Sequence, residues 1–478
     1  NRFSHRLDNL AKELFNYDTI KYGDICGKGA KQVTFDKIHP NEALDYAAED
    51  ADVCLRLYKV LKNDLFLSKL NTVYERIERP LIPVISSMEK EGILINKSAL
   101  NSLSIEFQEK LNTLQKSIFD YCDEEFNIAS PKQLGEILFD KLKIESKAKK
   151  TKTGQYSTSE ETLSKLANKH EIVGKILKWR SLQKLITTYV TALPKQINNE
   201  TKRIHTIFNQ TLTSTGRLSS LNPNLQNIPI RTENGKLIRK AFTPRSDKHI
   251  LVSADYSQIE LRVIASMSND KSMIDAFNND EDIHTATAAN VFGIKLKDVT
   301  PEQRSHAKVV NFGIIYGVSA FGLSQQSSLS RKEAAEIIKN YFATYPKLKE
   351  YMDANIAFAR EHGYVKTIMN RKRRLKDINS RNGVVRGHAE RNAINAPIQG
   401  SAADIIKLAM IKIQAEIDVL GLQSKMLLQV HDELVFDVLK TELPTLKKLI
   451  KETMEGVLDS IVPLVIDLDV GNSWLEAH

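Results

Sequence analysis

Cysteine and tryptophan are scarce in this sequence, with three and two residues among 478. Cys26, Cys54 and Cys122 lie far apart and form no CxxC pair, so neither a zinc site nor a disulfide framework is expected. No apolar run is long enough to span a membrane, and no signal peptide precedes the chain. These absences predict a protein of the reducing cytoplasm that has no membrane partner.

Short-period repeats and a long Pro/Gly/Ser linker are also absent, although the length suggests two to four packed units. The hydrophobic share of 42% and the charged share of 27% are ordinary for a globular protein. The net charge of +9 permits a polyanionic partner but does not identify one. Because the first residue is Asn1 and not Met, we expect a fragment or a processed product.

Apolar spacing predicts helices over residues 40–63, 72–90 and 98–125. A lysine-dense stretch follows at residues 141–156, and it ends in a Ser/Thr-then-acid pattern at residues 157–161 that is typical of a helix N-cap. Taken alone, the basic stretch is most simply a solvated, mobile loop.

Strand patterns occur in two later places. Residues 249–254 run directly into Asp255, and residues 426–430 and 434–438 flank a tight turn at 431–433, which predicts a β-hairpin. The pattern between residues 266 and 416 is mostly helical. The chain is therefore expected to leave a sheet, build a helical lobe and return.

The acids at these strand ends are candidates for metal binding. An Asp at a strand end or turn usually caps backbone groups, so Asp255 or Asp432 alone is weak evidence. Side by side in a sheet, however, they would repel each other unless divalent cations held them. Two Mg²⁺ ions about 3.5–4 Å apart can clamp the attacking and leaving oxygens of an in-line displacement. This sparse carboxylate set suits Mg²⁺ better than Ca²⁺ or Zn²⁺.

A second pattern places Arg304, Lys308, Phe312 and Tyr316 four residues apart, on one slowly winding stripe of a helix predicted over residues 304–317. Cations suit a triphosphate, and aromatic rings suit a base and sugar. The alternative is a helix that packs its two aromatic residues into a core and leaves its two cations in solvent.

Five segments in order resemble the motifs of family-A DNA polymerases. Three of them correspond to motifs A, B and C, and the others to an upstream and a downstream palm signature. These segments are residues 255–262, 304–317, 430–433, 213–229 and 392–400. The similarity extends over essentially the whole chain and is closest to the bacterial DNA polymerase I group.

The resemblance implies a role for each matching residue at the reaction centre. Asp255 and Asp432 would hold two Mg²⁺ ions, for which Mn²⁺ would be a substitute, with the carbonyl of Tyr256 as a further ligand and Glu433 in support. Arg304 and Lys308 would bind the triphosphate, and Lys308 would protonate the departing pyrophosphate. Further nucleotide contacts are implied for Gln258 and His284.

The resemblance also implies how sugar, base and duplex are checked. Tyr316 would stack near the templating base, and Glu260 would exclude a ribose 2′-hydroxyl. Phe312 stands where some relatives have Tyr, which predicts discrimination against dideoxynucleotides. Minor-groove and backbone contacts with DNA are implied for Arg217, Asn395, Gln399, Arg231, Arg391, Lys149, Lys150 and Lys152.

The implied fold is α+β, with a right-hand architecture of antiparallel palm sheet, helical fingers and helical thumb. A remnant of an RNase H-like 3′–5′ exonuclease domain would precede it, with Tyr46 and Asp50 on one helical face. Its remaining carboxylates would lie before Asn1, so no proofreading is expected from this chain. The expected boundaries are 1–70 exonuclease-like, 71–167 thumb, 168–264 palm, 265–388 fingers and 389–478 palm.

The expected partners are primer–template DNA and deoxynucleoside triphosphates, bound by a monomer that acts in replication and repair. A single-subunit RNA polymerase shares the hand-shaped fold and the two aspartates, but the context of Glu260 argues against it. A duplex-binding protein derived from an inactive polymerase is the non-enzyme alternative. The intact Asp255, Asp432, Arg304 and Lys308 argue against that one.

Overall fold

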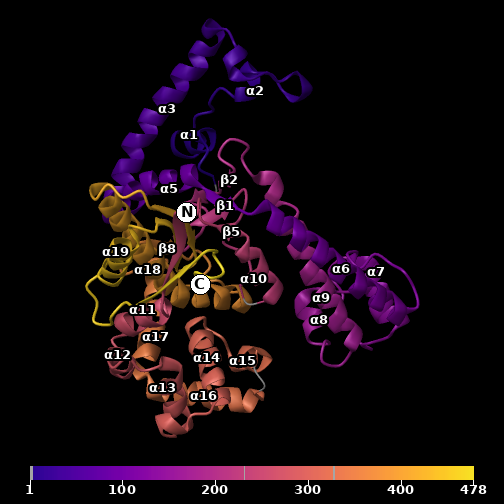
Figure 1. The fold of residues 1–478 in the computed structure, drawn as a ribbon. Coiled ribbons are helices and arrows are strands. Elements are labelled where there is room, and N and C mark those ends of the chain that lie inside the picture. The colour runs from indigo at the N-terminus through magenta and orange to yellow at the C-terminus, as the bar shows by residue number, and fades with distance from the viewer. Residues whose placement is uncertain (1–3, 231, 327–328) are drawn as a thin grey trace.

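A four-stranded antiparallel sheet lies at the centre of the C-terminal half of the chain (Figure 1). The computed structural model describes residues 4–230, 232–326 and 329–478. The strand order is β11-β6-β10-β9. These strands are β6 (His249–Tyr256), β9 (Lys425–Val430), β10 (Glu433–Leu439) and β11 (Ile466–Gly471). The predicted strand before Asp255 and the predicted hairpin are both confirmed.

The two inner strands of the sheet, β6 and β10, are buried because they are flanked by other strands and covered by helices. Residues 251–254 of β6 and 433–438 of β10 are all buried, and they include Ser253, Glu433 and Asp437. Helices α5 (Arg79–Glu91) and α19 (Leu443–Glu455) contact β9 and β10 respectively, and α18 (Gly383–Val419) packs on α19 and α5. Near-continuous apolar strands are what such coverage requires.

The strand register fixes where the acids meet. Glu433 pairs directly with Asp255 across β10 and β6. The backbone N–H of Tyr256 donates to the carbonyl oxygen of Asp432 over 3.2 Å. The turn between β9 and β10 therefore ends beside the last residues of β6.

Between β6 and β9 the chain builds a helical lobe, seen below the sheet in Figure 1. Its helices are α11 (Ile259–Ser268), α12 (Lys271–Asn278), α13 (Ile283–Phe292), α14 (Pro301–Ile315), α15 (Ala320–Gln326), α16 (Arg331–Thr344) and α17 (Pro346–His362), with the short η7 (Leu296–Asp298). The mostly helical prediction is confirmed, except that β7 (Tyr364–Lys366) and β8 (Lys372–Arg374) form an unpredicted hairpin.

A second helical lobe extends to the right in Figure 1. It contains α6 (Lys97–Cys122), α7 (Pro131–Gly135), η4 (Glu136–Lys141), α8 (Glu160–Ser164), α9 (Glu171–Leu185) and η5 (Ile186–Val190). Helix α9 packs along α6, so helices on both sides of the boundary expected at residue 167 share one packed lobe. The predicted helix at 98–125 ends at Cys122 because Asp123 is left-handed, with φ of 50°.

The N-terminal segment forms a separate arm at the top of Figure 1. It comprises α1 (Leu7–Phe15), α2 (Tyr22–Ile25), η1 (Gly29–Lys31), η2 (Phe35–Lys37) and α3 (Pro40–Leu67). The helix predicted over 72–90 is present as three consecutive elements, which are α4 (Asn71–Val73), the π-helical η3 (Tyr74–Glu78) and α5. None of the helices among the described residues has the length and hydropathy of a membrane span.

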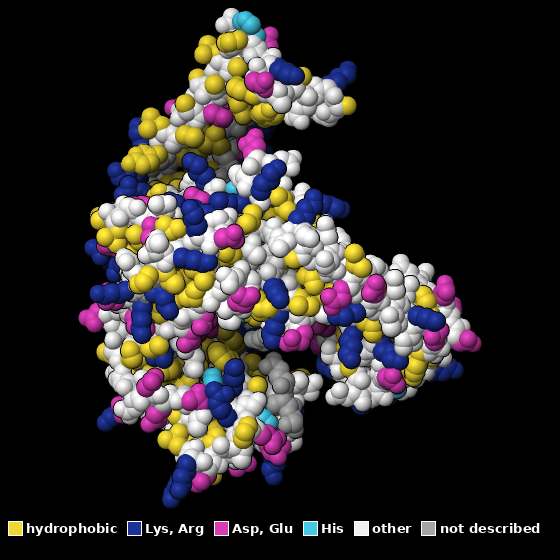
Figure 2. Space-filling view, viewed as in Figure 1, with side chains coloured by type: hydrophobic (Ala, Val, Ile, Leu, Met, Phe, Trp, Pro, Cys, Tyr) yellow, Lys and Arg dark blue, Asp and Glu magenta, His cyan; other side chains and the backbone are white. Residues whose placement is uncertain are grey.

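Small elements connect these lobes. A three-stranded sheet has the order β2-β1-β5, and β3 pairs with β4. The remaining elements are β1 (Ile93–Ile95), η6 (Leu193–Gln196), β2 (Arg203–Ile204), β3 (Ile207–Asn209), β4 (Ser219–Leu221), α10 (Glu233–Lys240) and β5 (Phe242–Thr243). Figure 2 shows that the surface is indented between the α12–α16 lobe and the α6–α9 lobe.

Candidate active site

Asp255 and Asp432 are brought together where β6 ends beside the β9–β10 turn. Burial, with the nearby charges of Asp432 and Glu433, raises the pKa of Asp255 to about 7. Burial also raises the pKa of Asp432 to about 6, and Glu260 adds to this effect while Arg217 opposes it. Two partly buried carboxylates that destabilise each other's charge would be stabilised by a cation between them.

Glu433 is adjacent to this pair, but other groups occupy its oxygens. Its Oε1 accepts hydrogen bonds from the Ser253 hydroxyl at 2.6 Å and from the Trp474 indole N–H at 2.8 Å. Arg239 Nη1 lies 3.6 Å from its Oε2, and His478 Nδ1 lies 3.5 Å from Oε1. Burial opposes ionisation, yet these partners hold the pKa of Glu433 below its ordinary value. Glu433 is thus an anchored carboxylate in the wall of the site.

A chain of polar contacts links Glu260 to this aspartate pair. Glu260 is 6% exposed, and its two oxygens accept from the Tyr316 hydroxyl at 2.7 Å and from Arg217 Nη2 at 2.6 Å. The same Arg217 nitrogen lies 3.8 Å from Asp432 Oδ1. Burial and Glu260 raise the pKa of Tyr316, so its hydroxyl stays protonated as a donor.

The predicted cation–aromatic stripe lies on α14, but the helix begins three residues earlier and ends two residues earlier than expected. Thr300 and Gln303 form a capping box at its start. The helix ends at Ile315, because Gly317 takes a φ of +68°, so Tyr316 is the C-cap residue and not a helical one. Arg304 and Lys308 are exposed, whereas Phe312 and Tyr316 are half-buried.

Arg304 is held by an acid that the sequence analysis did not assign. Its Nε and Nη2 donate to the two oxygens of Asp282 at 2.7 and 3.0 Å. Asp282 also caps α13 by accepting from the N–H of Thr285 at 2.9 Å. Although burial alone would raise it, these hydrogen bonds bring the pKa of Asp282 to about 2. The pair joins the first part of α14 to the start of α13.

His284 lies beneath the stripe as a buried, neutral side chain. Burial lowers its pKa to about 4, with Arg304 and Lys308 contributing. The amide of Asn311 lies 2.9 Å from His284 Nδ1, and an amide nitrogen can only donate. Nδ1 is therefore the acceptor, and Nε2 carries the hydrogen. The Phe312 ring lies 5.7 Å from the imidazole, centroid to centroid.

Several predicted nucleotide-contact and DNA-contact residues have buried polar atoms without a partner among the described residues. These atoms are Gln258 Oε1, Arg217 Nε and Asn395 Oδ1. Buried polar groups are normally hydrogen-bonded, so these atoms are available to contact a bound nucleotide or DNA. Similar atoms on Arg239, Arg245 and Arg373 show that this signal is not specific to the site.

The remaining predicted residues of this region have simple positions. Gln399 is half-buried one helical turn after Asn395 on α18. Arg391 is exposed on the same helix, and its side chain packs against Gly317. The Tyr256 hydroxyl donates to the Met454 carbonyl at 2.8 Å, so only the main chain of Tyr256 is left for a metal. Arg231 lies outside the described residues.

Lys149, Lys150 and Lys152 are exposed on a closed turn of the α6–α9 lobe, and not on an open loop. Lys150 forms a β-bridge with Tyr156, and its ammonium lies 4.7 Å from that ring's centroid. Thr151 N–H donates to the Gln155 carbonyl at 2.7 Å. The predicted N-cap is confirmed, since Ser159 accepts from the N–H of Thr162 and α8 begins at Glu160.

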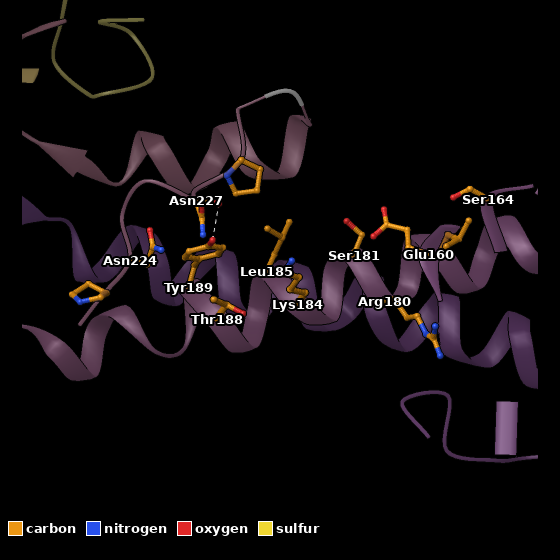
Figure 3. A pocket seen from close by; sticks show the side chains of 13 residues that line it. Glu160, Ser164, Arg180, Ser181, Lys184, Leu185, Thr188, Tyr189, Asn224 and Asn227 are labelled. Atoms are coloured by element: carbon orange, nitrogen blue, oxygen red, sulfur yellow. Dashed lines mark hydrogen bonds between the residues drawn. The ribbon is translucent and has the colours of Figure 1, made fainter. Parts of the chain in front are cut away.

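A groove of about 640 Å³ lies between α9, η5 and the segment at residues 223–229 (Figure 3). Ser181, Lys184 and Thr188 are exposed, and their spacing of three and four residues places them on one helical face. The Tyr189 hydroxyl donates to the Asn227 carbonyl at 2.7 Å across the groove. The groove therefore lies between the helical lobe and the predicted upstream signature.

On the N-terminal arm, Tyr46 and Asp50 both lie on α3. Burial and Asp50 raise the pKa of Tyr46. The neighbouring Glu49 accepts from the Tyr17 hydroxyl and the Ile20 N–H, each at 2.7 Å. Among the described residues, no group of three or more His, Cys, Asp and Glu side chains is arranged to hold a metal.

Sequence reasoning missed the residues that support the site. Asp282 carried a local signal, because an acid three residues before Thr285 marks a helix N-cap. Arg239 and Trp474, which support Glu433, are distant in sequence and gave no signal. The sequence pattern alone could not have identified them.

Comparison with known proteins places the chain in a family. The family model described as DNA polymerase family A matches residues 97–476, and one described as 3'-5' exonuclease matches residues 1–65. The first match covers most of the chain. The chain therefore belongs to DNA polymerase family A.

Individual relatives agree with this assignment. DNA polymerase I of Pseudomonas aeruginosa is 48% identical over 477 residues, covering 99% of this chain and 52% of that protein. DNA polymerase I of Caldicellulosiruptor bescii is 51% identical over 421 residues, covering 88% of this chain and 49% of that protein. The chain thus spans about half the length of these curated relatives.

A solved structure is similar over the whole chain. It is the POL domain of Pol1 from M. smegmatis in complex with DNA primer-template and dNTP. Its TM-score is 0.91 at 38% identity, covering 100% of this chain and 80% of that one. The α+β fold expected from the sequence is confirmed by this likeness and by the antiparallel sheet.

Proposed function

We propose that this chain is a template-directed DNA polymerase that adds deoxynucleoside monophosphates to a primer 3′-hydroxyl in replication and repair. The primer oxygen would attack the α-phosphorus of the incoming nucleotide, and the bond to pyrophosphate would break. The observation that carries the proposal is that Asp255 and Asp432 lie together at the end of β6, beside the Arg217–Glu260–Tyr316 contacts. The M. smegmatis structure contains DNA primer-template and dNTP, the partners proposed here.

The donor set fits magnesium. Mg²⁺ is usually held by one or two carboxylates, with waters and substrate phosphates as its other ligands. Asp255 and Asp432 supply two carboxylates whose pKa values are raised mainly by burial, so a bound cation would stabilise their charged forms. When bound, the ions would activate the attacking oxygen and neutralise charge on the leaving one. Glu433, already engaged by Ser253 and Trp474, would hold the wall of the site in place.

The start of α14 would bind the triphosphate. Arg304, whose side chain is exposed, would exchange its two hydrogen bonds with Asp282 for bonds to phosphate oxygens. His284 would present its Nε2–H to a phosphate oxygen. Lys308 would donate a proton to the departing pyrophosphate, where negative charge develops. Gln258 would add a further contact.

The Glu260 carboxylate would face the sugar and leave no room for a 2′-hydroxyl, so deoxynucleotides would be selected. Tyr316 and Phe312 would contact the base and the sugar. Arg217, Asn395 and Gln399 would contact minor-groove acceptors that all Watson–Crick pairs share, which checks pair geometry without sequence preference. Arg391 would contact the primer end.

The two helical lobes would hold the duplex and close over the nucleotide, as the thumb and fingers of a monomeric enzyme. Ser181, Lys184 and Thr188 in the groove of Figure 3 offer a hydroxyl–ammonium–hydroxyl series suited to backbone phosphates. Lys149, Lys150 and Lys152 would contact duplex phosphates farther from the reaction.

Primer extension tests the proposal directly. With Mg²⁺ and a primed template, we expect the added nucleotides to follow the template, and dNTPs to be used far better than NTPs. Preferred use of ribonucleotides would favour a single-subunit RNA polymerase instead. Tight duplex binding without any extension would favour a non-catalytic DNA-binding protein.

A further inference from the structure

Four charged side chains form a buried ionic cluster away from the two aspartates. The members are Glu78 of η3, Arg371 of the β7–β8 turn, and Asp404 and Lys407 of α18. Arg371 Nε donates to Asp404 Oδ1 at 2.7 Å, and its Nη2 donates to Glu78 Oε1 at 2.5 Å. Lys407 Nζ donates to the same Glu78 oxygen at 2.7 Å. The side chains of Asp404 and Lys407 are 0% and 1% exposed.

The buried ionic cluster holds one loop, residues 210–217, at both ends. Gln210 Nε2 donates to the carbonyl oxygen of Glu78 at 3.0 Å and to its Oε2 at 2.7 Å. At the other end, Gly216 has φ of +90° and packs on Arg371 so closely that a Cβ there would lie 2.8 Å from Nε. The residues that contact the two ends of the loop, Glu78 and Arg371, form an ion pair with each other.

The same cluster also supports Thr215, the loop residue just before Gly216. Thr367 donates its hydroxyl to Asp404 Oδ2 at 2.6 Å. A Cβ at Gly400 would lie 2.5 Å from Thr367 Cγ2 and 3.0 Å from the carbonyl oxygen of Thr215. Thr367, Gly400 and Thr215 are therefore packed without spare room. The path of the loop backbone depends on where Arg371 and Asp404 lie.

Arg217 is the last residue of this loop and directly follows Gly216. Its Nη2 lies 2.6 Å from Glu260 and 3.8 Å from Asp432, so a small shift of the loop would break either contact. The backbone carbonyl of Arg217 accepts from the Thr213 hydroxyl at 2.6 Å, which ties the guanidinium to the loop conformation. The pairing of Asn209 with Ser219 closes the β3–β4 hairpin around this loop, and the contacts of Gln210 and Gly216 tie the loop to the buried ionic cluster.

We propose that Arg371, held by Glu78 and Asp404, is the positioning residue that places Arg217 against Glu260 and Asp432 for primer extension. This inference rests on the proposed polymerase function. The cluster contains two acids and two bases, so it adds no net charge to the site. A planar guanidinium can bridge two acids in fixed directions, whereas an ammonium at the same position cannot. Arg371→Lys therefore separates the geometry from the charge.

The test measures single-nucleotide extension by the parent, Arg371→Lys, Arg217→Ala and the double variant. Extension by the parent and its loss in Asp255→Asn establish the function first, so a failure of the positioning role is recognised separately. We expect Arg371→Lys to lower kcat about tenfold and to change the nucleotide KM less than about twofold. In the Arg217→Ala background, we expect the same change to have almost no further effect.

Two more variants distinguish a displaced loop from a general loss of folding. Gly216→Ala leaves the cluster intact but forces the loop away from Arg371, and we expect the same loss of kcat, again absent when Arg217 is alanine. Arg203→Lys makes the matched change in a half-buried pair with Glu91, at 3.1 Å, and should extend primers like the parent. The proposal would be overturned if Arg371→Lys lowered kcat by the same factor in the parent and in Arg217→Ala. Full extension activity of Arg371→Lys would also overturn it.

Discussion

The Tyr316 hydroxyl lies 2.7 Å from Glu260 Oε2, so the residue at the end of α14 is hydrogen-bonded to the proposed sugar selector. We expect Glu260→Ala to open space beside the sugar and to lower the preference for dNTP over NTP at least about tenfold. A small difference in how a substrate group fits its pocket typically contributes about 1–3 kcal/mol to discrimination between two substrates. The ratio of kcat/KM for dNTP and NTP measures it.

Tyr316→Phe is the matched control for this prediction. It removes only the hydroxyl that bonds Glu260, and Arg217 still holds the other carboxylate oxygen. Sugar selection should therefore stay within about threefold of the parent. If Tyr316→Phe relaxes the selection as much as Glu260→Ala does, the carboxylate acts through the tyrosine and not by its own bulk.

Glu433 should behave differently from Asp255, although the two residues pair across the strands. Gln at 433 can still accept from Ser253 and Trp474 but cannot neutralise Arg239. We expect Glu433→Gln to retain extension within about tenfold and to lose about 1–3 kcal/mol of unfolding free energy. Asp255→Asn should lose extension by more than about a thousandfold. Denaturant unfolding and extension rates check both; comparable loss of extension in the two variants would make Glu433 a metal ligand.

Acid should destabilise the protein partly through His284. Its pKa in the folded protein is about 4, below the ordinary value of 6.5, so the unfolded chain binds the proton first as pH falls. This stabilising contribution is complete above about pH 6.5 and is lost toward pH 4. The shift corresponds to about 3 kcal/mol.

The comparison of parent and His284→Gln isolates this contribution. Between pH 7.5 and 4.5 the parent should lose more unfolding free energy than the variant, because Gln does not titrate. Parallel curves of unfolding free energy against pH would show that His284 is not the buried neutral group described here.

Binding of duplex DNA should depend on salt through the basic turn of the α6–α9 lobe. Replacing Lys149, Lys150 and Lys152 by Gln should reduce the slope of log Kd against log salt by about 2–3, since each phosphate contact contributes nearly one. The rate of extension at saturating DNA should not change. The exposed Lys447, Lys448 and Lys451 of α19 provide a matched triple control. An unchanged slope in the first triple variant would remove the turn from the DNA interface.

Strands β6, β9 and β10 could be predicted because short apolar runs bounded by turn residues leave few alternatives, but β11 was not predicted. The meeting of Asp255 with Asp432 was expected from the family resemblance. The β7–β8 hairpin could not, since its strands are basic and carry no apolar alternation. The end of α14 at Ile315 depends on the positive φ of Gly317, which a four-residue spacing does not reveal. The anchoring of Glu433 by Trp474 and Arg239 depends on contacts between distant segments, and no local pattern encodes those.

The central claim is that Asp255 and Asp432 bind the same divalent ions. Mn²⁺ binding measured by electron paramagnetic resonance, with a dideoxy-terminated primer on its template and the next dNTP, tests it most directly. We expect two ions in the parent and in Glu433→Gln. We expect at least about tenfold weaker binding in both Asp255→Asn and Asp432→Asn. Undiminished binding of both ions in either aspartate variant would contradict the account.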